Sequence, residues 1–188
     1  FRSRMATPLN GATLGILGMG AIGQAVARLA LALGVPVLGT NRRGATLAGA
    51  EILPPERTDE VLAQADYLLL LLPATPETEN FINAPRLARM KKTAWLLNFG
   101  RGHLIDDAAL IAAVTGGQLD GAMLDVFRQE PLPTTHPFWT TPGIAVLPHI
   151  GGGHPQRDRV VAALFADNLA RFLDGRKLRE EVDRAAGY

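Results

Sequence analysis

Short apolar runs alternate with longer amphipathic or alanine-rich segments along most of the chain. The apolar runs have the length of strands and are bounded by glycine, proline or aspartate, which predicts strands at 12–17, 35–39, 67–72, 93–98, 119–124 and 144–147. Helices are expected between and after them, at 24–33, 58–62, 83–92, 106–114 and 155–173. Segment 46–53 fits neither pattern clearly. The alternation predicts an α/β fold built on a doubly wound parallel sheet.

Polar residues mark the ends of several of these helices. Asn83 is expected to cap one helix, and Thr58 or Asp59 to cap another, because their side chains accept hydrogen bonds from exposed backbone N–H groups. Lys91 and Lys92 are expected at the carboxyl end of helix 83–92, where the helix dipole favours positive charge.

A glycine turn, Gly18-Met19-Gly20-Ala21-Ile22-Gly23, follows the first strand. Gly18 permits the sharp turn, Gly20 lets a pyrophosphate approach the backbone, and Gly23 lets the next helix pack closely on the strand. The N–H groups and the positive dipole end of that helix would face the phosphates. A purely structural turn is the alternative, but the strand before it and the helix after it favour a Rossmann-like dinucleotide-binding domain.

The second strand ends in the run Thr40-Asn41-Arg42-Arg43-Gly44. Sites that prefer NAD carry an acidic residue about 20 positions after the glycines, where it binds the ribose 2′-hydroxyl. Here Asn41 is neutral, and the guanidinium groups of Arg42 and Arg43 can attract a 2′-phosphate. We therefore predict NADP as the preferred cofactor, with NAD possible. The alternative is that the two arginines are solvated loop charges.

Arg101, Glu130 and His149 each follow a different predicted strand, and a parallel sheet assembles its sites at that edge. Arg101 offers a planar fork for a substrate carboxylate, and His149 can donate a proton to a ketone oxygen. Glu130 can hold the imidazole of His149 and favour its protonated form. Asp125 could hold a nicotinamide carboxamide or tune the histidine. Taken singly, each residue is also compatible with a solvated or packed loop position.

Composition excludes several other classes of function. The chain has 188 residues with 19 basic and 18 acidic side chains, a balance that argues against nucleic-acid or membrane-surface partners. The absence of cysteine excludes disulfides, thiolate nucleophiles and cysteine-ligated zinc, and we expect no metal site. No apolar run is long enough to span a bilayer, and nothing at the N-terminus resembles a signal peptide. We expect a cytoplasmic protein.

Taken in order, several segments resemble the cofactor-binding domain of the D-isomer-specific 2-hydroxyacid dehydrogenases. They are 17–23, 72–78, 97–102, 122–132 and Pro148-His149. Within that family, the sequence is most similar to the glyoxylate/hydroxypyruvate reductases, and Asn41-Arg42-Arg43 fits a branch that commonly uses NADPH. Asn41 stands where the family often has an acidic residue, so it departs from the NAD-preferring pattern.

The resemblance implies roles for individual residues. Arg101, Glu130 and His149 would be the catalytic residues. Further residues would lie along the cofactor: Ala21, Ile22, Arg42, Pro73, Phe99, Asp125 and Gly151. The resemblance also implies reduction of a small 2-keto acid to the D-2-hydroxy acid by NADPH or NADH.

The resemblance further implies how the chain is organised. Residues 1–174 would form the dinucleotide-binding domain, with a last helix that returns to an N-terminal substrate domain absent from this chain, and residues 175–188 a tail. Family members generally form homodimers through the cofactor domain. Two other functions stay open: a dinucleotide-sensing, corepressor-like protein, and the cofactor domain of a phosphoglycerate-type dehydrogenase. Glu130 disfavours a formate dehydrogenase, which lacks the glutamate of the Glu–His pair.

Overall fold

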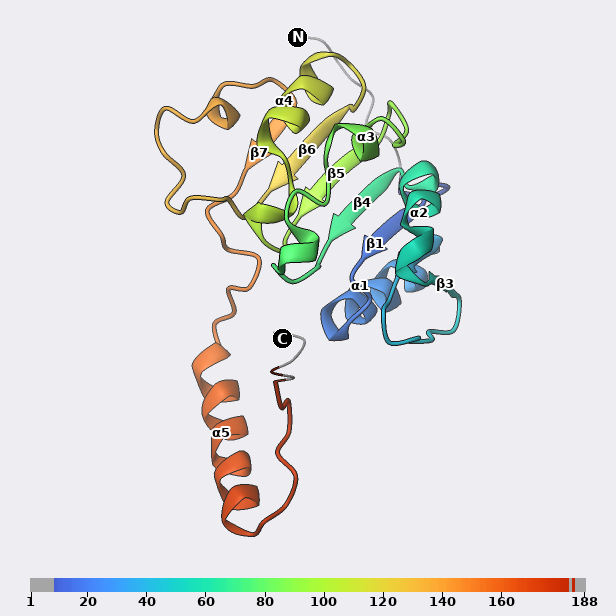
Figure 1. Cartoon of the computed structure of the whole chain (residues 1–188). Coiled ribbons are helices and arrows are strands. Elements are labelled where there is room, and N and C mark those ends of the chain that lie inside the picture. Colours follow the sequence, from blue (N-terminus) through green and yellow to red (C-terminus); the bar gives the residue numbers. More distant parts are fainter. Residues whose placement is uncertain (1–8, 183, 185–188) are drawn as a thin grey trace. The chain divides into compact units, whose positions relative to one another are not determined.

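The computed structural model describes residues 9–182 and 184. Contacts divide the chain into one unit that ends at Pro148 and a second that begins at His149. The first unit holds a seven-stranded sheet in the order β3-β2-β1-β4-β5-β6-β7, with every neighbouring pair parallel (Figure 1). This confirms the predicted doubly wound parallel sheet. The domain boundary after residue 174 stays a prediction.

The strands match the apolar runs of the sequence but are shorter. Their bounds are β1 Leu14–Leu17, β2 Val37–Thr40, β3 Ala50–Leu53, β4 Tyr67–Leu70, β5 Trp95–Asn98, β6 Gly121–Leu124 and β7 Ile144–Val146. The unassigned segment 46–53 supplies β3, which pairs only with β2 and so lies at the sheet edge. The strand order reverses between β1 and β4, and parallel sheets bind ligands beside that point, past the carboxyl ends of the strands.

Helices cover both faces of the sheet. They are α1 Ala21–Ala32, α2 Thr58–Gln64, α3 Ala84–Leu87 and α4 Asp107–Thr115, with short 3₁₀ turns η1 Pro55–Arg57, η2 Pro76–Thr78, η3 Gly102–Leu104 and η4 Pro137–Trp139. Ala27 and Ala30 of α1 pack with Ile16 and Met19 in one buried cluster. Helices α2, α3 and α4 contribute to a larger cluster that contains Leu68 and Leu96 of the sheet. Burial of strands between two apolar layers explains their near-continuous leucine and valine content.

Two predictions about helix ends are wrong. Neither Thr58 nor Asp59 caps α2, because η1 precedes that helix, Arg57 is its N-cap residue, and the Thr58 hydroxyl donates to the Pro55 carbonyl at 2.6 Å. Helix α3 ends at Leu87, so Lys91 does not lie at its carboxyl end. Asn83, by contrast, caps α3 as predicted, with its side-chain oxygen accepting from the Arg86 amide.

The second unit consists of helix α5, Arg157–Leu173, and the chain around it. The chain after α5 turns back on the helix, because the Asn168 amide donates to the Arg179 carbonyl at 3.0 Å and accepts from the Arg179 N–H at 2.8 Å. Residues 183 and 185–188 of the predicted tail, and residues 1–8 before the first strand, lie outside the described residues. Throughout the described ranges, no helix combines the length and apolar character needed to cross a bilayer.

Asp66 joins the starts of β1 and β4. Its carboxylate accepts from the Thr13 amide at 2.8 Å and from Lys91 Nζ at 2.9 Å. Partial burial raises the pKa of Asp66, but the hydrogen bonds from Lys91 and Thr13 and the charge of Lys91 outweigh it and hold this pKa below its usual value. The ionised form of Asp66 therefore stabilises the fold.

We predict that Asp66→Asn lowers the free energy of unfolding by about 1 kcal/mol near neutral pH, since the half-exposed Lys91 limits the ion-pair contribution. The folded-state pKa of Asp66 is depressed, so this contribution is present above the unfolded-state pKa and is lost as the pH falls through the folded-state value. Urea unfolding of both proteins across that range should therefore converge at acid pH. A difference that stays constant into acid would contradict the prediction.

Candidate active site

The glycine turn has the geometry that its sequence predicts. Gly18 has φ +106°, and a Cβ there would lie 2.8 Å from the Leu71 backbone. A Cβ on Gly23 would lie 2.5 Å from the Gly18 carbonyl oxygen, because α1 starts directly against the turn. Both positions therefore require glycine for close backbone packing.

Gly20 differs from these two glycines. Apart from Gly20 and its chain neighbours, no heavy atom of the described residues lies within 4 Å of a Cβ built there, so the space above it is open. Gly20 is the N-cap of α1, and in the described structure no side chain caps that helix. Ala21 and Ile22 follow it in the first turn, and Ile22 is 68% exposed. Open space at an uncapped helix N-terminus fits a dinucleotide pyrophosphate.

The Asn41 side chain joins the glycine turn to the loop after β2. Its Nδ2 donates to the Met19 carbonyl at 2.7 Å, and its Oδ1 accepts from the amides of Arg43 at 2.7 Å and Ala45 at 3.1 Å. The amide thus closes the turn that carries Arg42 and Arg43, whose side chains are exposed.

The loop after β4 faces the same region. The Thr75 hydroxyl, the backbone of Glu77 and the charge of Arg42 together hold the pKa of Glu77 below its usual value. The carbonyl of Pro73 accepts from the Thr78 hydroxyl at 2.7 Å, which closes this loop at its start. Because β2 and β4 lie on either side of β1 in the sheet, the loops that follow them flank the glycine turn.

Arg101 is presented by a turn that the buried side chain of Asn98 builds. Asn98 Nδ2 donates to the Arg101 carbonyl at 3.0 Å, and its Oδ1 accepts from the Gly100 amide at 3.1 Å. Phe99 lies between them, half-buried against the cluster under α1. Sequence reasoning did not single out Asn98, although a polar residue that closes an apolar strand was a usable signal.

The loop after β6 carries the other two predicted residues of this unit. Asp125 is 2% exposed, and its amide donates to the Asn98 carbonyl at 3.0 Å. Glu130 is exposed, and its Oε1 accepts from the Phe127 amide at 2.9 Å, which closes the loop on itself. A Cβ on Gly102 would lie 2.0 Å from the Phe127 carbonyl carbon, so the loops bearing Arg101 and Glu130 meet backbone to backbone.

His149 and Gly151 belong to the second unit. His149 has φ +54°, a left-handed conformation that is uncommon for residues with a side chain and is often found at functional sites. The structure thus brings together the loops that carry Arg101, Asp125 and Glu130, whereas their grouping with His149 stays a prediction.

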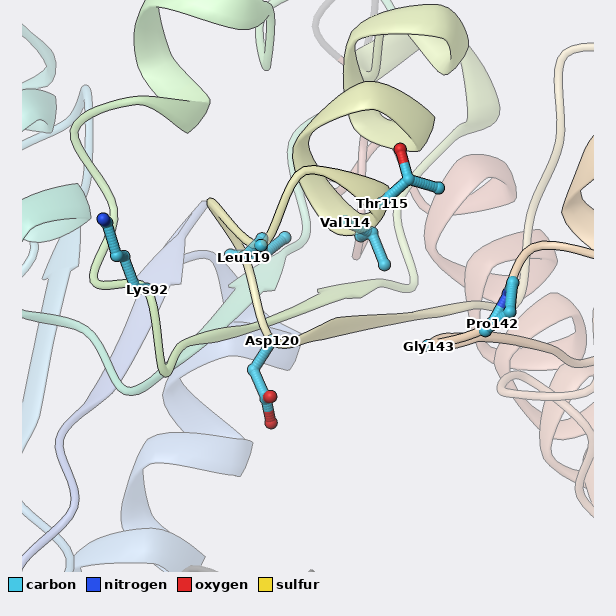
Figure 2. Close-up of a pocket in the computed structure, with 8 residues that line it drawn as sticks. Lys92, Val114, Thr115, Leu119, Asp120, Pro142 and Gly143 are labelled. Carbon is cyan, nitrogen blue, oxygen red and sulfur yellow. The ribbon is translucent and has the colours of Figure 1, made fainter. Parts of the chain in front are cut away.

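A pocket lies near the starts of β5, β6 and β7, at the opposite ends of the strands from the candidate active site (Figure 2). Lys92, Asp120 and Gly143, which line it, precede β5, β6 and β7, whereas the predicted site residues of this unit follow strands or the glycine turn. The pocket is therefore separate from the candidate active site. Across residues 9–182 and 184, no three His, Asp or Glu side chains gather in a group that could hold a metal ion.

The sequence matches proteins of known class. Residues 2–151 match the family model described as D-isomer specific 2-hydroxyacid dehydrogenase, NAD binding domain. The chain is 43% identical over 167 residues to glyoxylate/hydroxypyruvate reductase B of Serratia proteamaculans, which covers 87% of this chain and 51% of that relative. The chain thus spans about half the length of the curated relatives that it matches.

Solved structures agree with this match. The NADPH-dependent glyoxylate/hydroxypyruvate reductase of Sinorhizobium meliloti, in complex with NADP and sulfate, has a TM-score of 0.91 and 33% identity, over 100% of this chain and 60% of that one. A D-isomer specific 2-hydroxyacid dehydrogenase of Xanthobacter autotrophicus, in complex with NADPH and MES, has a TM-score of 0.92 and 33% identity, over 100% of this chain and 77% of that one. With its glycine turn, parallel sheet and family match, the chain belongs to the D-isomer specific 2-hydroxyacid dehydrogenase family, whose NAD-binding domain it forms.

Proposed function

We propose that this chain is the NADP-binding half of a reductase that converts a small 2-keto acid, such as glyoxylate or hydroxypyruvate, into the D-2-hydroxy acid. The observation that carries the proposal is the meeting of the Arg101 and Glu130 loops at the sheet edge that also bears the open turn at Gly20. An N-terminal substrate domain would supply the rest of the pocket, in keeping with the larger length of the relatives. The proposal includes this division of the protein, in which residues 1–174 form the dinucleotide-binding domain.

The loop after β2 favours NADP over NAD. Arg42 and Arg43 are exposed beside the glycine turn, and the turn that Asn41 closes carries no carboxylate of its own to repel a 2′-phosphate. The similar structures from Sinorhizobium meliloti and Xanthobacter autotrophicus contain NADP and NADPH. Ala21, Ile22, Pro73, Phe99, Asp125 and Gly151 would line the rest of the cofactor site.

When bound, the nicotinamide supplies the hydride that reduces the ketone carbon. Arg101 would bind the substrate carboxylate through its planar fork and orient the adjacent ketone. His149 would donate a proton to the ketone oxygen as negative charge develops there. Glu130 would keep His149 protonated and oriented, because a neighbouring carboxylate favours the imidazolium form.

We also propose a homodimer formed through the cofactor domain. Leu29 of α1 and Leu33, the C-cap residue of that helix, are 69% and 71% exposed, which leaves an apolar surface suited to a second copy at this end of the helix. A cytoplasmic location stays a prediction from the sequence.

The open space at Gly20 predicts that a substitution there weakens cofactor binding without changing stability. Gly20→Ala should leave the free energy of unfolding within about 0.5 kcal/mol, because the new methyl meets no atom of the described chain, yet should weaken NADPH binding at least about tenfold. Gly23→Ala is the matched variant and should cost about 1–3 kcal/mol of stability, because its methyl meets the Gly18 carbonyl. Fluorescence titration with NADPH and thermal unfolding measure both effects. Unchanged NADPH affinity in Gly20→Ala would contradict the assignment of this turn.

The arginine pair predicts cofactor preference. The double variant Arg42→Ala, Arg43→Ala should raise the dissociation constant for NADPH roughly 10–100-fold and leave that for NADH within about twofold, because only NADPH carries the 2′-phosphate. Arg57→Ala, which removes an exposed arginine paired with Glu60, is the matched control. Tighter binding of NADH than of NADPH by the unaltered protein would overturn the proposed preference.

The proposed proton donor predicts a loss of rate. In the full-length enzyme, His149→Ala should lower kcat for NADPH-dependent glyoxylate reduction by about 10²–10⁴-fold, the usual contribution of a general acid. His154→Ala, in the same unit but without a proposed role, should leave kcat unchanged. Steady-state rates of NADPH oxidation test both variants, and an unchanged kcat in His149→Ala would refute the assignment.

A further inference from the structure

The side chain of Arg128 connects segments that are far apart in the sequence. Its Nη1 pairs with Glu79 Oε1 at 2.6 Å, and its Nη2 donates to the side-chain oxygen of Asn80 and to the carbonyls of His103 and Ile105. Its Nε lies 3.7 Å from Asp107 Oδ1. Only 30% of the side chain is exposed, so these contacts are partly shielded from water.

The segments that Arg128 contacts adjoin the candidate active site. The carbonyls of His103 and Ile105 lie just after Arg101, in and directly behind η3. Glu79 and Asn80 directly follow η2 in the loop after β4, on the proposed cofactor side. One guanidinium group therefore fastens the loop after β6 to the loops after β5 and β4.

The attachment of Arg128 also restrains Glu130, because both residues belong to the loop after β6. Arg128 directly follows Phe127, whose amide donates to Glu130 Oε1 at 2.9 Å. The Gly102 backbone leaves no room for a Cβ against Phe127, since such an atom would lie 2.0 Å from its carbonyl carbon. The Arg128 side chain thus acts where the two loops already touch.

The chemistry of this contact requires arginine. A guanidinium group has five N–H donors in a rigid fork, and here they donate to the Glu79 carboxylate, the Asn80 amide oxygen and two backbone carbonyls, while Nε forms a longer ion pair with Asp107. A lysine ammonium is a single nitrogen and cannot reach the loop after β4, the loop after β5 and Asp107 of α4 at the same time. On the far side of Asp107 lies His136 Nε2, at 3.6 Å from Oδ2.

We infer that Arg128 is a positioning residue for the reductase reaction, holding the Glu130 loop against the Arg101 loop so that both side chains address one substrate. This inference rests on the proposed function. Without Arg128, the Glu130 loop would be held against the Arg101 loop only by the backbone contacts at Gly102 and Asn98. Glu130 would then support the proton donor less well, and Arg101 would align the substrate carboxylate less precisely. The cofactor turn at Gly20 and the arginines after β2 are untouched.

The test compares Arg128→Ala and Arg128→Lys in the full-length enzyme with NADPH and glyoxylate. Arg128→Ala should lower kcat roughly 10–100-fold and raise the KM for glyoxylate, because small displacements of reacting groups are costly. The alkaline limb of the kcat/KM profile should move to lower pH, as it does in Glu130→Gln, since both changes remove support for the protonated histidine. Arg128→Lys should fall between Arg128→Ala and the unaltered enzyme, and the dissociation constant for NADPH should stay within about twofold.

Controls separate this inference from the proposed function. Arg57→Ala, another arginine paired with a glutamate, should change none of these quantities. If Glu130→Gln shifts the pH limb and Arg128→Ala and Arg128→Lys both leave kcat and the limb unchanged, the positioning role is wrong while the proposed function stands. A lower kcat with an unmoved limb indicates a merely structural arginine and likewise overturns the inference.

A second measurement does not need activity. Hydrogen–deuterium exchange in Arg128→Lys should rise in peptides covering 101–105 and 126–131 and stay unchanged in 14–33. If the unaltered enzyme reduces no 2-keto acid, the proposed function fails, and the exchange result still decides whether Arg128 holds the two loops together. Unchanged exchange in both peptides would refute that role.

Discussion

The parallel direction of all seven strands is the constraint on which the molecule depends. Because every strand ends at the same edge, residues that lie far apart in the sequence emerge side by side there. Gly18, Arg101 and Asp125 lie in the connections that leave that edge, after β1, β5 and β6. The opposite edge holds the starts of the strands, where Asp66 ties β1 to β4 through Thr13 and Lys91. The starts of the strands thus carry a stabilising ion pair, and their carboxyl ends carry the residues of the proposed active site.

The carboxyl edge works because backbones approach closely there. A Cβ on Gly23 or Gly102 would collide with main-chain atoms, so these glycines bring α1 onto its turn and the loop after β5 onto the loop after β6. Gly20 has no such contact and leaves space for a ligand. Gly23 and Gly102 therefore allow close backbone packing, whereas Gly20 leaves open space. The atoms that surround each Cα, and not conformational freedom alone, explain this difference.

The sequence predicts the sheet because continuous apolar runs bounded by breakers are a local signal. It leaves β3 unassigned, since Ala50–Leu53 is an edge strand with only one partner and a mixed pattern. It also misplaces Lys91, which pairs with a carboxylate 25 residues earlier in the chain. The acceptors of Arg128 include positions 23 and 49 residues away, so no local pattern reveals its role. The residues that we propose to bind ligands follow strand ends, which the sequence pattern can locate, whereas residues that hold those loops depend on tertiary contacts.

The Asn41 side chain links the proposed cofactor preference to the fold. Its oxygen accepts from two amides of its own loop, a task that an aspartate could also perform. Its Nδ2, however, donates to the Met19 carbonyl inside the glycine turn, and a carboxylate has no proton to donate there. An acidic residue at this position would place two oxygens against each other at the point where the pyrophosphate turn is built. The neutral amide therefore does more than avoid repelling a 2′-phosphate: it couples the turn that presents Arg42 and Arg43 to the turn that would hold the phosphates.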